Sequence, residues 1–153
     1  MSSKTLQTSP KCPTCGEYKN RAISIDAIIK QDGKILLIKR GINPFKGYWA
    51  IPGGHVDFDE TLEKSTIREV REETGLTVTK LTLFGIYSDP GRHPRQTIAV
   101  AYQTEVKGNP KAGDDAVDLA WFSPDQLPTK LAFDHSKIFK DYFNKGLEPT
   151  ISI

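Results

Sequence analysis

The stretch "GHVDFDETLEKSTIREVREETGL" (residues 54–76) decides the fold, because it combines a predicted helix with an unusual concentration of acidic side chains. Its pattern predicts an α-helix from about Thr61 to Thr74, with Asp59 as the N-cap. Gly75 then fits the left-handed residue that commonly ends a helix. The acidic side chains on this helix need a physical explanation.

Three of the acids share one face of the predicted helix. Because an α-helix turns about 100° per residue, Glu72 and Glu73 lie about 60° and 40° to either side of Glu69. We expect Val70 and Ile67, on roughly the opposite half, to pack against a sheet. Like charges at this spacing repel, and acids near a helix C-terminus oppose its dipole. Most charged helix faces are simply solvated, but this face of carboxylates also suits a hard cation such as Mg²⁺.

The composition indicates a globular protein of one domain. The chain has 153 residues, of which 37% are hydrophobic and 26% are charged, and its net charge is +2. No apolar run approaches the roughly 20 residues that span a bilayer, and the polar N-terminal segment lacks a signal-peptide core. We therefore expect a cytoplasmic protein with no membrane partner. The small net charge gives no reason to expect a nucleic-acid partner.

Runs of β-branched and apolar residues predict an α/β architecture, in which helices cover a mixed sheet. The expected strands cover residues 22–30, 35–39, 76–88, 96–106 and 117–122, and an amphipathic helix covers residues 134–146. Ser123 is expected to cap a single turn after the last strand. Residues 41–54 form a loop broken by proline and glycine. The domain is expected to comprise residues 21–153, after a polar tail at residues 1–20.

The tail carries a Cys-x-x-Cys pair, Cys12 and Cys15, which are the two cysteines of the chain. A structural zinc site commonly takes four ligands, often from two such pairs. This chain supplies one pair, so a zinc-ribbon protein is an unfavoured alternative. We expect an inert knuckle.

The acidic segment resembles the signature box of the Nudix hydrolases. The constrained positions are filled by Gly54, Glu60, Arg68, Glu69, Val70, Glu72, Glu73, Gly75 and Leu76. The resemblance implies an α/β/α sandwich with a mixed β-sheet, and Mg²⁺-dependent hydrolysis of the pyrophosphate bond of a nucleoside diphosphate derivative. Mn²⁺ is an implied substitute for Mg²⁺. The implied partner is a small-molecule nucleotide, and a homodimer is allowed.

The same resemblance assigns roles to individual residues. The implied metal ligands are Gly53, Glu69, Glu72 and Glu73, and the implied catalytic set is Glu69, Glu72, Glu73, Arg68 and Glu60. In this interpretation Arg68 orients the glutamates and Glu60 braces the loop and the helix. Members of the family differ in the catalytic base. A glutamate of the box is favoured here, and the alternatives are Asp114, Asp115 and Asp118.

Two segments outside the box point to a substrate. "YSDPGRHPR" (residues 87–95) and "LAFDHSKI" (residues 131–138) resemble segments of ADP-ribose pyrophosphatases. The expected reaction is therefore the hydrolysis of ADP-ribose to AMP and ribose 5-phosphate. The candidate substrate-binding residues combine positive charge with rings, and they are Arg40, Arg92, Arg95, Phe133 and His135. The sequence has "RHPRQ" where the ADP-ribose enzymes favour "RDPR" and a glycine.

Two other functions are compatible with the resemblance. The first is a pyrophosphohydrolase that acts on nucleoside triphosphates such as oxidised dGTP. The second is a regulator that binds ADP-ribose without hydrolysing it. Such regulators normally carry a damaged box and an added DNA-binding domain, whereas this box is intact.

Overall fold

The computed structural model describes residues 11–17 and 20–144 of the chain. The tail predicted at residues 1–20 therefore lies partly outside the described residues, as do residues 145–153 at the end of the predicted domain. The strands are β1 (Ile23–Gln31), β2 (Lys34–Arg40), β3 (Trp49–Ala50), β4 (Gly53–His55), β5 (Thr77–Tyr87), β6 (Ile98–Lys107) and β7 (Ala116–Phe122). The helices are α1 (Leu62–Thr74) and α2 (His135–Asn144), with short 3-10 turns at Pro90–Arg92 and Pro124–Gln126.

The strands form one mixed sheet with β1 at its centre. The order is β3-β2-β1-β6-β5, with β4 also paired to β1 and β7 also paired to β2. The first part of β1 runs parallel to β6 and antiparallel to β4, while its last residues form a hairpin with β2. A strand in this position has partners on both sides, and residues 25–29 of β1 are buried. The side chains of β1 are therefore well placed to support a site.

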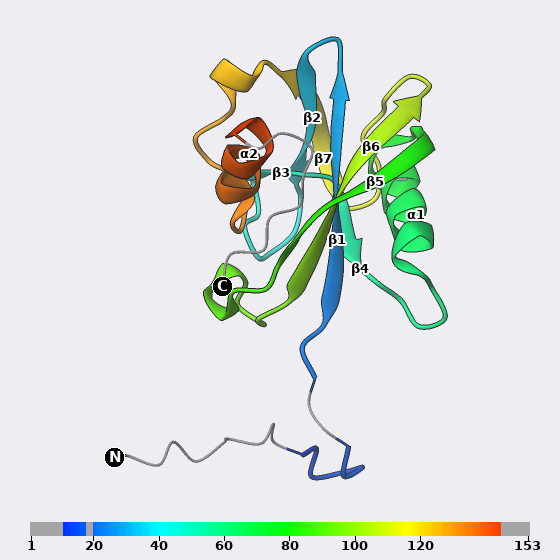
Figure 1. Ribbon diagram of the computed structural model, residues 1–153, viewed down its shortest axis with the longest axis vertical. Helices are drawn as coiled ribbons and strands as arrows, with labels where there is room; N and C mark the ends of the chain where they lie inside the picture. The colour runs from blue at the N-terminus through cyan, green and yellow to red at the C-terminus, as the bar shows by residue number, and fades with distance from the viewer. Residues whose placement is uncertain (1–10, 18–19, 145–153) are drawn as a thin grey trace.

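Helices cover both faces of this sheet (Figure 1). Successive residues of a strand point to opposite faces. Accordingly, Ala27 and Ile29 pack with Val70 of α1, whereas Ile28 packs with Ile138 of α2. The predicted α/β/α sandwich with a mixed sheet is confirmed.

Helix α1 differs from the prediction at its start. Thr61 is the N-cap, and its side chain accepts a hydrogen bond from the Lys64 N–H at 3.2 Å. Asp59 was expected in this role, but its backbone has φ of 64°. That conformation lies outside the extended region that an N-cap residue normally adopts, so the cap falls two residues later. Gly75 ends the helix with φ of 69°, as predicted.

The buried side of α1 also differs from the prediction. Val70 is fully buried as expected, but Ile67 is 45% exposed. The acids Glu69 and Glu73 are themselves buried, at 8% and 4% exposure. Two of the three acids of this face are therefore packed against the protein, whereas Glu72 is exposed. Ile67 is turned away from the core.

The loop predicted at residues 41–54 contains the two short strands β3 and β4. The β4 strand pairs with β1 so that Asp26 lies opposite Gly53 and Ile25 opposite Gly54. This pairing holds the two glycines against the sheet and directly beside α1. At the other end of the sheet, Ser123 precedes the second 3-10 turn but makes no side-chain capping hydrogen bond.

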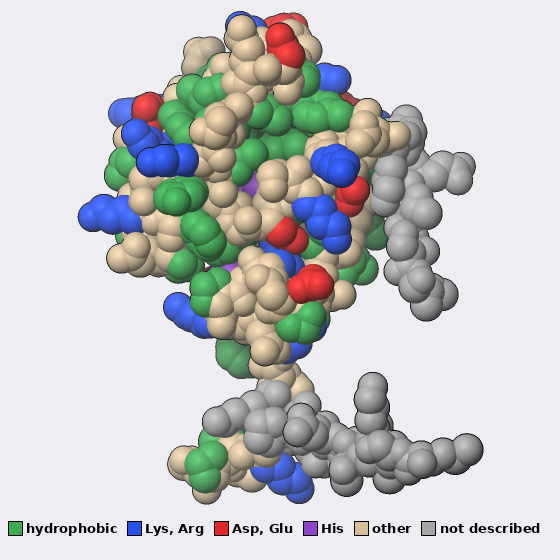
Figure 2. Space-filling model, turned by 90° about the vertical axis from the view of Figure 1, so that its left-hand side faces the viewer, with side chains coloured by type: hydrophobic (Ala, Val, Ile, Leu, Met, Phe, Trp, Pro, Cys, Tyr) green, Lys and Arg blue, Asp and Glu red, His purple; other side chains and the backbone are tan. Residues whose placement is uncertain are grey.

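The surface on the α2 side is mixed in character. Figure 2 shows basic side chains scattered among apolar ones on this face, where only small areas of histidine reach the surface. Within the described part of the chain, no helix has the length and apolar character needed to cross a membrane. The cytoplasmic location stays a prediction, as does the boundary between the tail and the domain at residue 20.

Candidate active site

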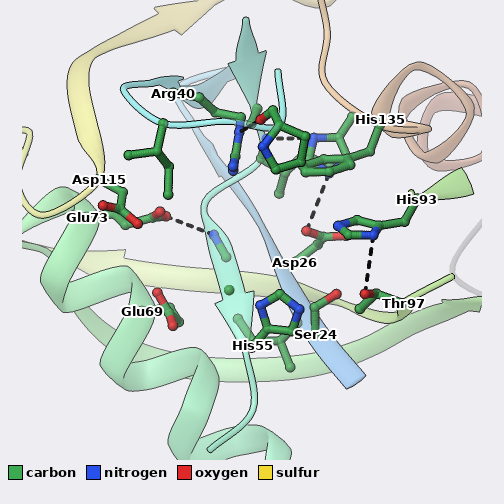
Figure 3. Close-up of a pocket in the computed structure, with 18 of the residues that line it drawn as sticks. Ser24, Asp26, Arg40, His55, Glu69, Glu73, His93, Thr97, Asp115 and His135 are labelled. Carbon is green, nitrogen blue, oxygen red and sulfur yellow. Dashed lines mark hydrogen bonds and ion pairs between the residues drawn. The ribbon is translucent and has the colours of Figure 1, made fainter. Parts of the chain in front are cut away.

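A cavity of about 360 Å³ opens between α1, β4 and the loops that follow β2, β5 and β6. Its volume falls in the range of ordinary small-molecule sites. Figure 3 shows that one end of this pocket is formed by the glutamates of α1. The other end is formed by Asp26 and by histidines from three separate segments. Every substrate-binding residue predicted from the sequence lines this cavity, namely Arg40, Arg92, Arg95, Phe133 and His135.

The acidic end of the pocket combines helix α1 with the glycines of β4. The Gly53 N–H donates a hydrogen bond to Glu73 Oε2 at 2.9 Å. A Cβ on Gly54 would lie 2.3 Å from Glu69 Oε1, and one on Gly53 would lie 2.0 Å from the Ile25 carbonyl oxygen. At Gly53 only glycine fits, because the Ile25 backbone cannot give way, and a side chain at Gly54 would displace the Glu69 carboxylate. The two glycines thus bring the backbone into contact with the carboxylates.

Arg68 connects the acids to the loop before the helix. Its Nε and Nη2 donate to both oxygens of Glu60, at 2.7 and 2.9 Å. Its Nη1 donates to Glu69 at 2.7 Å and to Glu72 at 3.1 Å, and Nη2 also reaches the His55 carbonyl oxygen at 3.1 Å. A planar guanidinium is suited to such a fork of charged contacts. One arginine therefore positions three glutamates and one end of β4.

The surroundings of Glu60, Glu69 and Glu73 shift their pKa values in different directions. Burial raises the pKa of Glu73 to about 8, although the Gly53 N–H opposes this shift. Burial also raises the pKa of Glu69, against the effect of Arg68. The hydrogen bonds from Arg68 instead lower the pKa of Glu60 to about 2. The protein thus stabilises the charged form of Glu60, whereas burial disfavours the charged form of Glu69 and Glu73.

The arginines of the pocket have different surroundings. Arg92 is buried, with 3% of its side chain exposed, and donates from Nε and Nη2 to Asp134 at 3.0 and 2.7 Å. Its Nη1 donates to the Thr97 carbonyl oxygen at 3.0 Å. Arg95, in contrast, is exposed. Arg40 donates from Nε to the Pro44 carbonyl oxygen at 2.8 Å, and burial lowers its pKa.

The aromatic residues predicted to bind substrate are held by neighbouring groups. Phe133 stacks on His93 with ring centroids 5.0 Å apart, and the Arg40 guanidinium lies 5.1 Å from the Phe133 ring centroid. His135 is 2% exposed, and its Nδ1 accepts a hydrogen bond from the Ile51 N–H at 3.0 Å. Because Ile51 lies two residues before Gly53, His135 connects the start of α2 to the glycine strand.

Comparison with known proteins identifies the family. A match to the NUDIX domain covers residues 19–142. The chain belongs to the Nudix family. It is 50% identical over 127 residues to an ADP-ribose pyrophosphatase of Methanocaldococcus jannaschii, a match that covers 82% of this chain and 75% of that protein.

Solved Nudix structures have the same fold. A MutT NUDIX hydrolase from Burkholderia pseudomallei is 31% identical, with a TM-score of 0.72 over 80% of this chain and 98% of that one. The NUDIX domain of Shewanella oneidensis NrtR, in a complex with ADP ribose, is 26% identical, with a TM-score of 0.73 over 82% of this chain and 88% of that one. The resemblance read from the box is confirmed, and the chain is a Nudix hydrolase.

Nudix hydrolases generally use divalent metal ions, and the acidic end of the pocket fits such an ion. Its donors are carboxylate oxygens with a backbone carbonyl nearby, the ligands that hard cations prefer. Burial raises the pKa of Glu69 and of Glu73, and a cation beside these carboxylates would oppose that shift. In the described part of the chain, no three acidic, histidine or cysteine side chains already converge as a metal cluster. Arg68 donates hydrogen bonds to Glu69 and Glu72, and the Gly53 N–H donates one to Glu73.

The alternative catalytic bases fall into two groups. Asp114 and Asp115 line the pocket of this Nudix domain, and the charge of Asp114 contributes to the raised pKa of Glu73. Asp118 is absent from the lining residues and accepts a hydrogen bond from the Leu119 N–H at 2.8 Å. Sequence reasoning could not separate these acids, because they lie close together in one turn and strand.

Sequence reasoning missed several residues of the Nudix pocket. Asp26, Ser24, His55 and Thr97 all line it. A signal for Asp26 was present, since "ISIDAII" places one acid inside an otherwise apolar buried strand. Charged residues are seldom fully buried unless they are paired or functional. The other three carry no comparable signal.

Proposed function

We propose that this Nudix hydrolase converts ADP-ribose and water to AMP and ribose 5-phosphate with Mg²⁺. The observation that carries the substrate is the 50% identity to an ADP-ribose pyrophosphatase over 82% of the chain. The location of both substrate segments in one pocket supports it, since Arg95 and Phe133 line the same cavity as Glu69 and Glu73.

Glu69, Glu72 and Glu73, with the Gly53 carbonyl oxygen, would hold the metal. When bound, Mg²⁺ would neutralise charge on the diphosphate and activate the attacking water, and Mn²⁺ would substitute for it. The chain's own residues prepare these positions. Arg68 fixes the carboxylates of Glu69 and Glu72, and Glu60 fixes Arg68 in turn.

We assign a different role to each arginine of the pocket. Arg95 is exposed at the pocket and is the group we assign to the phosphates. Arg40 lies within the electrostatic reach of Glu73, so its charge would act near the scissile bond. Arg92 is occupied by Asp134 and Thr97, so we assign it to holding the pocket floor.

A glutamate of the box remains the proposed base. Glu69 and Glu73 are buried acids with raised pKa values, a property common among catalytic groups. Asp114 and Asp115 line the pocket and are the remaining alternatives. A homodimer stays a prediction.

A substrate panel tests the function. Purified protein with Mg²⁺ is given ADP-ribose, other nucleoside diphosphate sugars, oxidised dGTP and ordinary nucleoside triphosphates, and products are separated by chromatography. We expect ADP-ribose to have the highest kcat/KM and to yield AMP and ribose 5-phosphate in equal amounts. A preference for oxidised dGTP would overturn the substrate and leave the family unchanged. Tight binding of ADP-ribose without turnover would instead favour the non-catalytic alternative.

A further inference from the structure

Asp26 is a buried acid on the floor of the pocket, at the end away from the metal-binding glutamates. It lies on β1 opposite Gly53 and is 6% exposed. Figure 3 shows it with His135 above it and His93 beside it. The hydrolysis as described above does not use this carboxylate, although burying a charged group is costly unless it has partners.

The contacts of Asp26 within the described residues are all long. Its Oδ1 lies 3.4 Å from His135 Nε2, and its Oδ2 lies 3.8 Å from Arg92 Nη2. The second distance is an ion-pair contact but too long for a hydrogen bond. Oδ2 is shielded from solvent and has no hydrogen-bond partner in the described part of the chain. Arg92 does not move closer because its nitrogens already bind Asp134 and Thr97.

The adjacent histidine offers a donor that is equally underused. Because His135 Nδ1 accepts from the Ile51 N–H, it carries no proton, and the ring proton is assigned to Nε2. The same Nε2 faces Asp26 Oδ1. The pocket floor therefore presents a carboxylate acceptor and an N–H donor side by side, and both residues line the cavity.

The chemistry of this pair selects its ligand. A phosphate oxygen accepts hydrogen bonds but is repelled by a carboxylate. An adenine edge offers its amino donor and a ring-nitrogen acceptor on two separate atoms. A hydroxyl group both donates and accepts. It can give its proton to Asp26 and receive the proton of His135 Nε2. A sugar hydroxyl thus satisfies both groups together.

We propose that Asp26 and His135 form a subsite that recognises one ribose hydroxyl of the substrate. Asp26 is the specificity-determining residue, and the sugar it binds lies on the side of the pocket away from the glutamates. This subsite explains how the enzyme would favour a nucleoside diphosphate sugar over a substrate that places a third phosphate there. The inference rests on the proposed function, because it supposes that the pocket takes a substrate with ribose on each side of the diphosphate.

A cycle between protein and substrate tests this subsite. Wild type, Asp26→Asn and Asp26→Ala are compared on ADP-ribose and on analogues that each lack one ribose hydroxyl. The measured quantity is the ratio of kcat/KM for ADP-ribose to kcat/KM for each analogue. For one analogue, we expect this ratio to be about ten to a hundred in wild type, the range for a hydrogen bond to a charged group. In Asp26→Ala the same ratio should fall to within about twofold of one. A merely structural role would lower activity on all substrates and leave the ratio unchanged, which would overturn the proposal.

Further arms keep the result interpretable. Asp141→Asn is the matched control, because Asp141 accepts a hydrogen bond from Tyr87 and is absent from the pocket lining. Its ratio should equal that of wild type. Circular dichroism and thermal unfolding check that each variant folds, and Asp26→Asn serves if Asp26→Ala does not. An analogue with hypoxanthine in place of adenine removes the amino group. If Asp26→Ala changed the ratio for the hypoxanthine analogue and for no deoxy analogue, Asp26 would recognise the base, and the sugar assignment would be refuted.

Failure of the proposed function can be told apart from failure of the subsite. Calorimetric binding of ADP-ribose and its deoxy analogues to the Glu73→Gln protein measures the same ratio without hydrolysis. If wild type binds ADP-ribose but does not cleave it, the proposed reaction fails, and the binding ratio still decides the subsite. If the protein neither binds nor cleaves ADP-ribose, both proposals are overturned.

Discussion

Glu73→Gln removes one buried charge while keeping the size of the side chain. Glu73 is 4% exposed and accepts the Gly53 N–H at 2.9 Å. The amide oxygen of glutamine can accept the same hydrogen bond, so the glycine strand keeps its anchor. The substitution therefore isolates the effect of the charge on stability and on activity.

The effect on stability has a defined sign. Burial raises the pKa of Glu73 from 4.5 to about 8. Between these values the folded protein holds a proton that the unfolded chain releases. Without metal, the free energy of unfolding therefore falls as pH rises through this window, by up to about 1.36 kcal/mol per pH unit. The loss in wild type should reach the order of a few kcal/mol near pH 9, whereas Glu73→Gln has no such carboxyl group and avoids it.

Urea unfolding in the presence of EDTA, followed by circular dichroism near pH 5, 7 and 9, measures this difference. Glu73→Gln should match wild type near pH 5 and be clearly more stable near pH 9. Glu72→Gln is the control, because 44% of the Glu72 side chain is exposed. With saturating Mg²⁺, kcat/KM of Glu73→Gln should fall at least about a hundredfold. This loss exceeds the effect of removing a residue that only holds a metal ligand in place.

Either of two results would refute this reasoning. The first is a difference in free energy of unfolding between wild type and Glu73→Gln, measured without metal, that is the same near pH 9 as near pH 5. Burial would then not destabilise the charged form of Glu73. If Glu73→Gln kept wild-type turnover in saturating Mg²⁺, Glu73 would not be a metal ligand. Addition of Mg²⁺ to wild type near pH 8 should also raise its stability, since a ligand that binds only the folded state stabilises it.

Four further predictions concern other parts of the molecule. Glu60→Gln should be less stable than wild type at neutral pH. The difference should vanish as pH falls from 4.5 to about 2, because the wild-type carboxylate takes up its proton in this range. Acid unfolding followed by circular dichroism measures the difference. Arg92→Ala should lower the free energy of unfolding, measured in urea, by roughly 3–5 kcal/mol, because a buried ion pair loses one partner. Arg95→Ala should leave stability unchanged and lower kcat/KM for ADP-ribose roughly ten- to a hundredfold. Elemental analysis of protein purified without chelator should find no stoichiometric zinc at Cys12 and Cys15, and half a zinc per chain would contradict this.

Local sequence signals were enough for the main elements. Helix α1 and the five longer strands follow from periodicity and from end signals such as Gly75, because these depend on residues close together in the chain. The box of glutamates could also be read directly, since three residues at spacings of three and four must share one helical face.

Other features depended on partners distant in sequence. The β4 strand exists because residues 53–55 pair with residues 24–26 of β1, and nothing in "PGGHV" alone indicates this pairing. The N-cap moved to Thr61 because the loop imposes a left-handed backbone on Asp59. Likewise, helical geometry could not tell that α1 turns Glu69 and Glu73 inward and Ile67 outward, since only the packing of β4 against the helix decides which face is buried.

The sequence by itself thus determined the acidic face, because three glutamates at short spacings share one side of a helix. The resemblance of the same segment to the Nudix box implied the family and the sandwich. Only the tertiary structure decided which charged residues are free to bind substrate. Arg92 and Arg95 are three residues apart, yet Asp134 engages the first and the second stays exposed. Asp26 and His135 are brought together from the two ends of the domain by the central strand and the start of α2. Pairings of this kind are fixed by packing across the sheet, which a linear sequence does not specify locally.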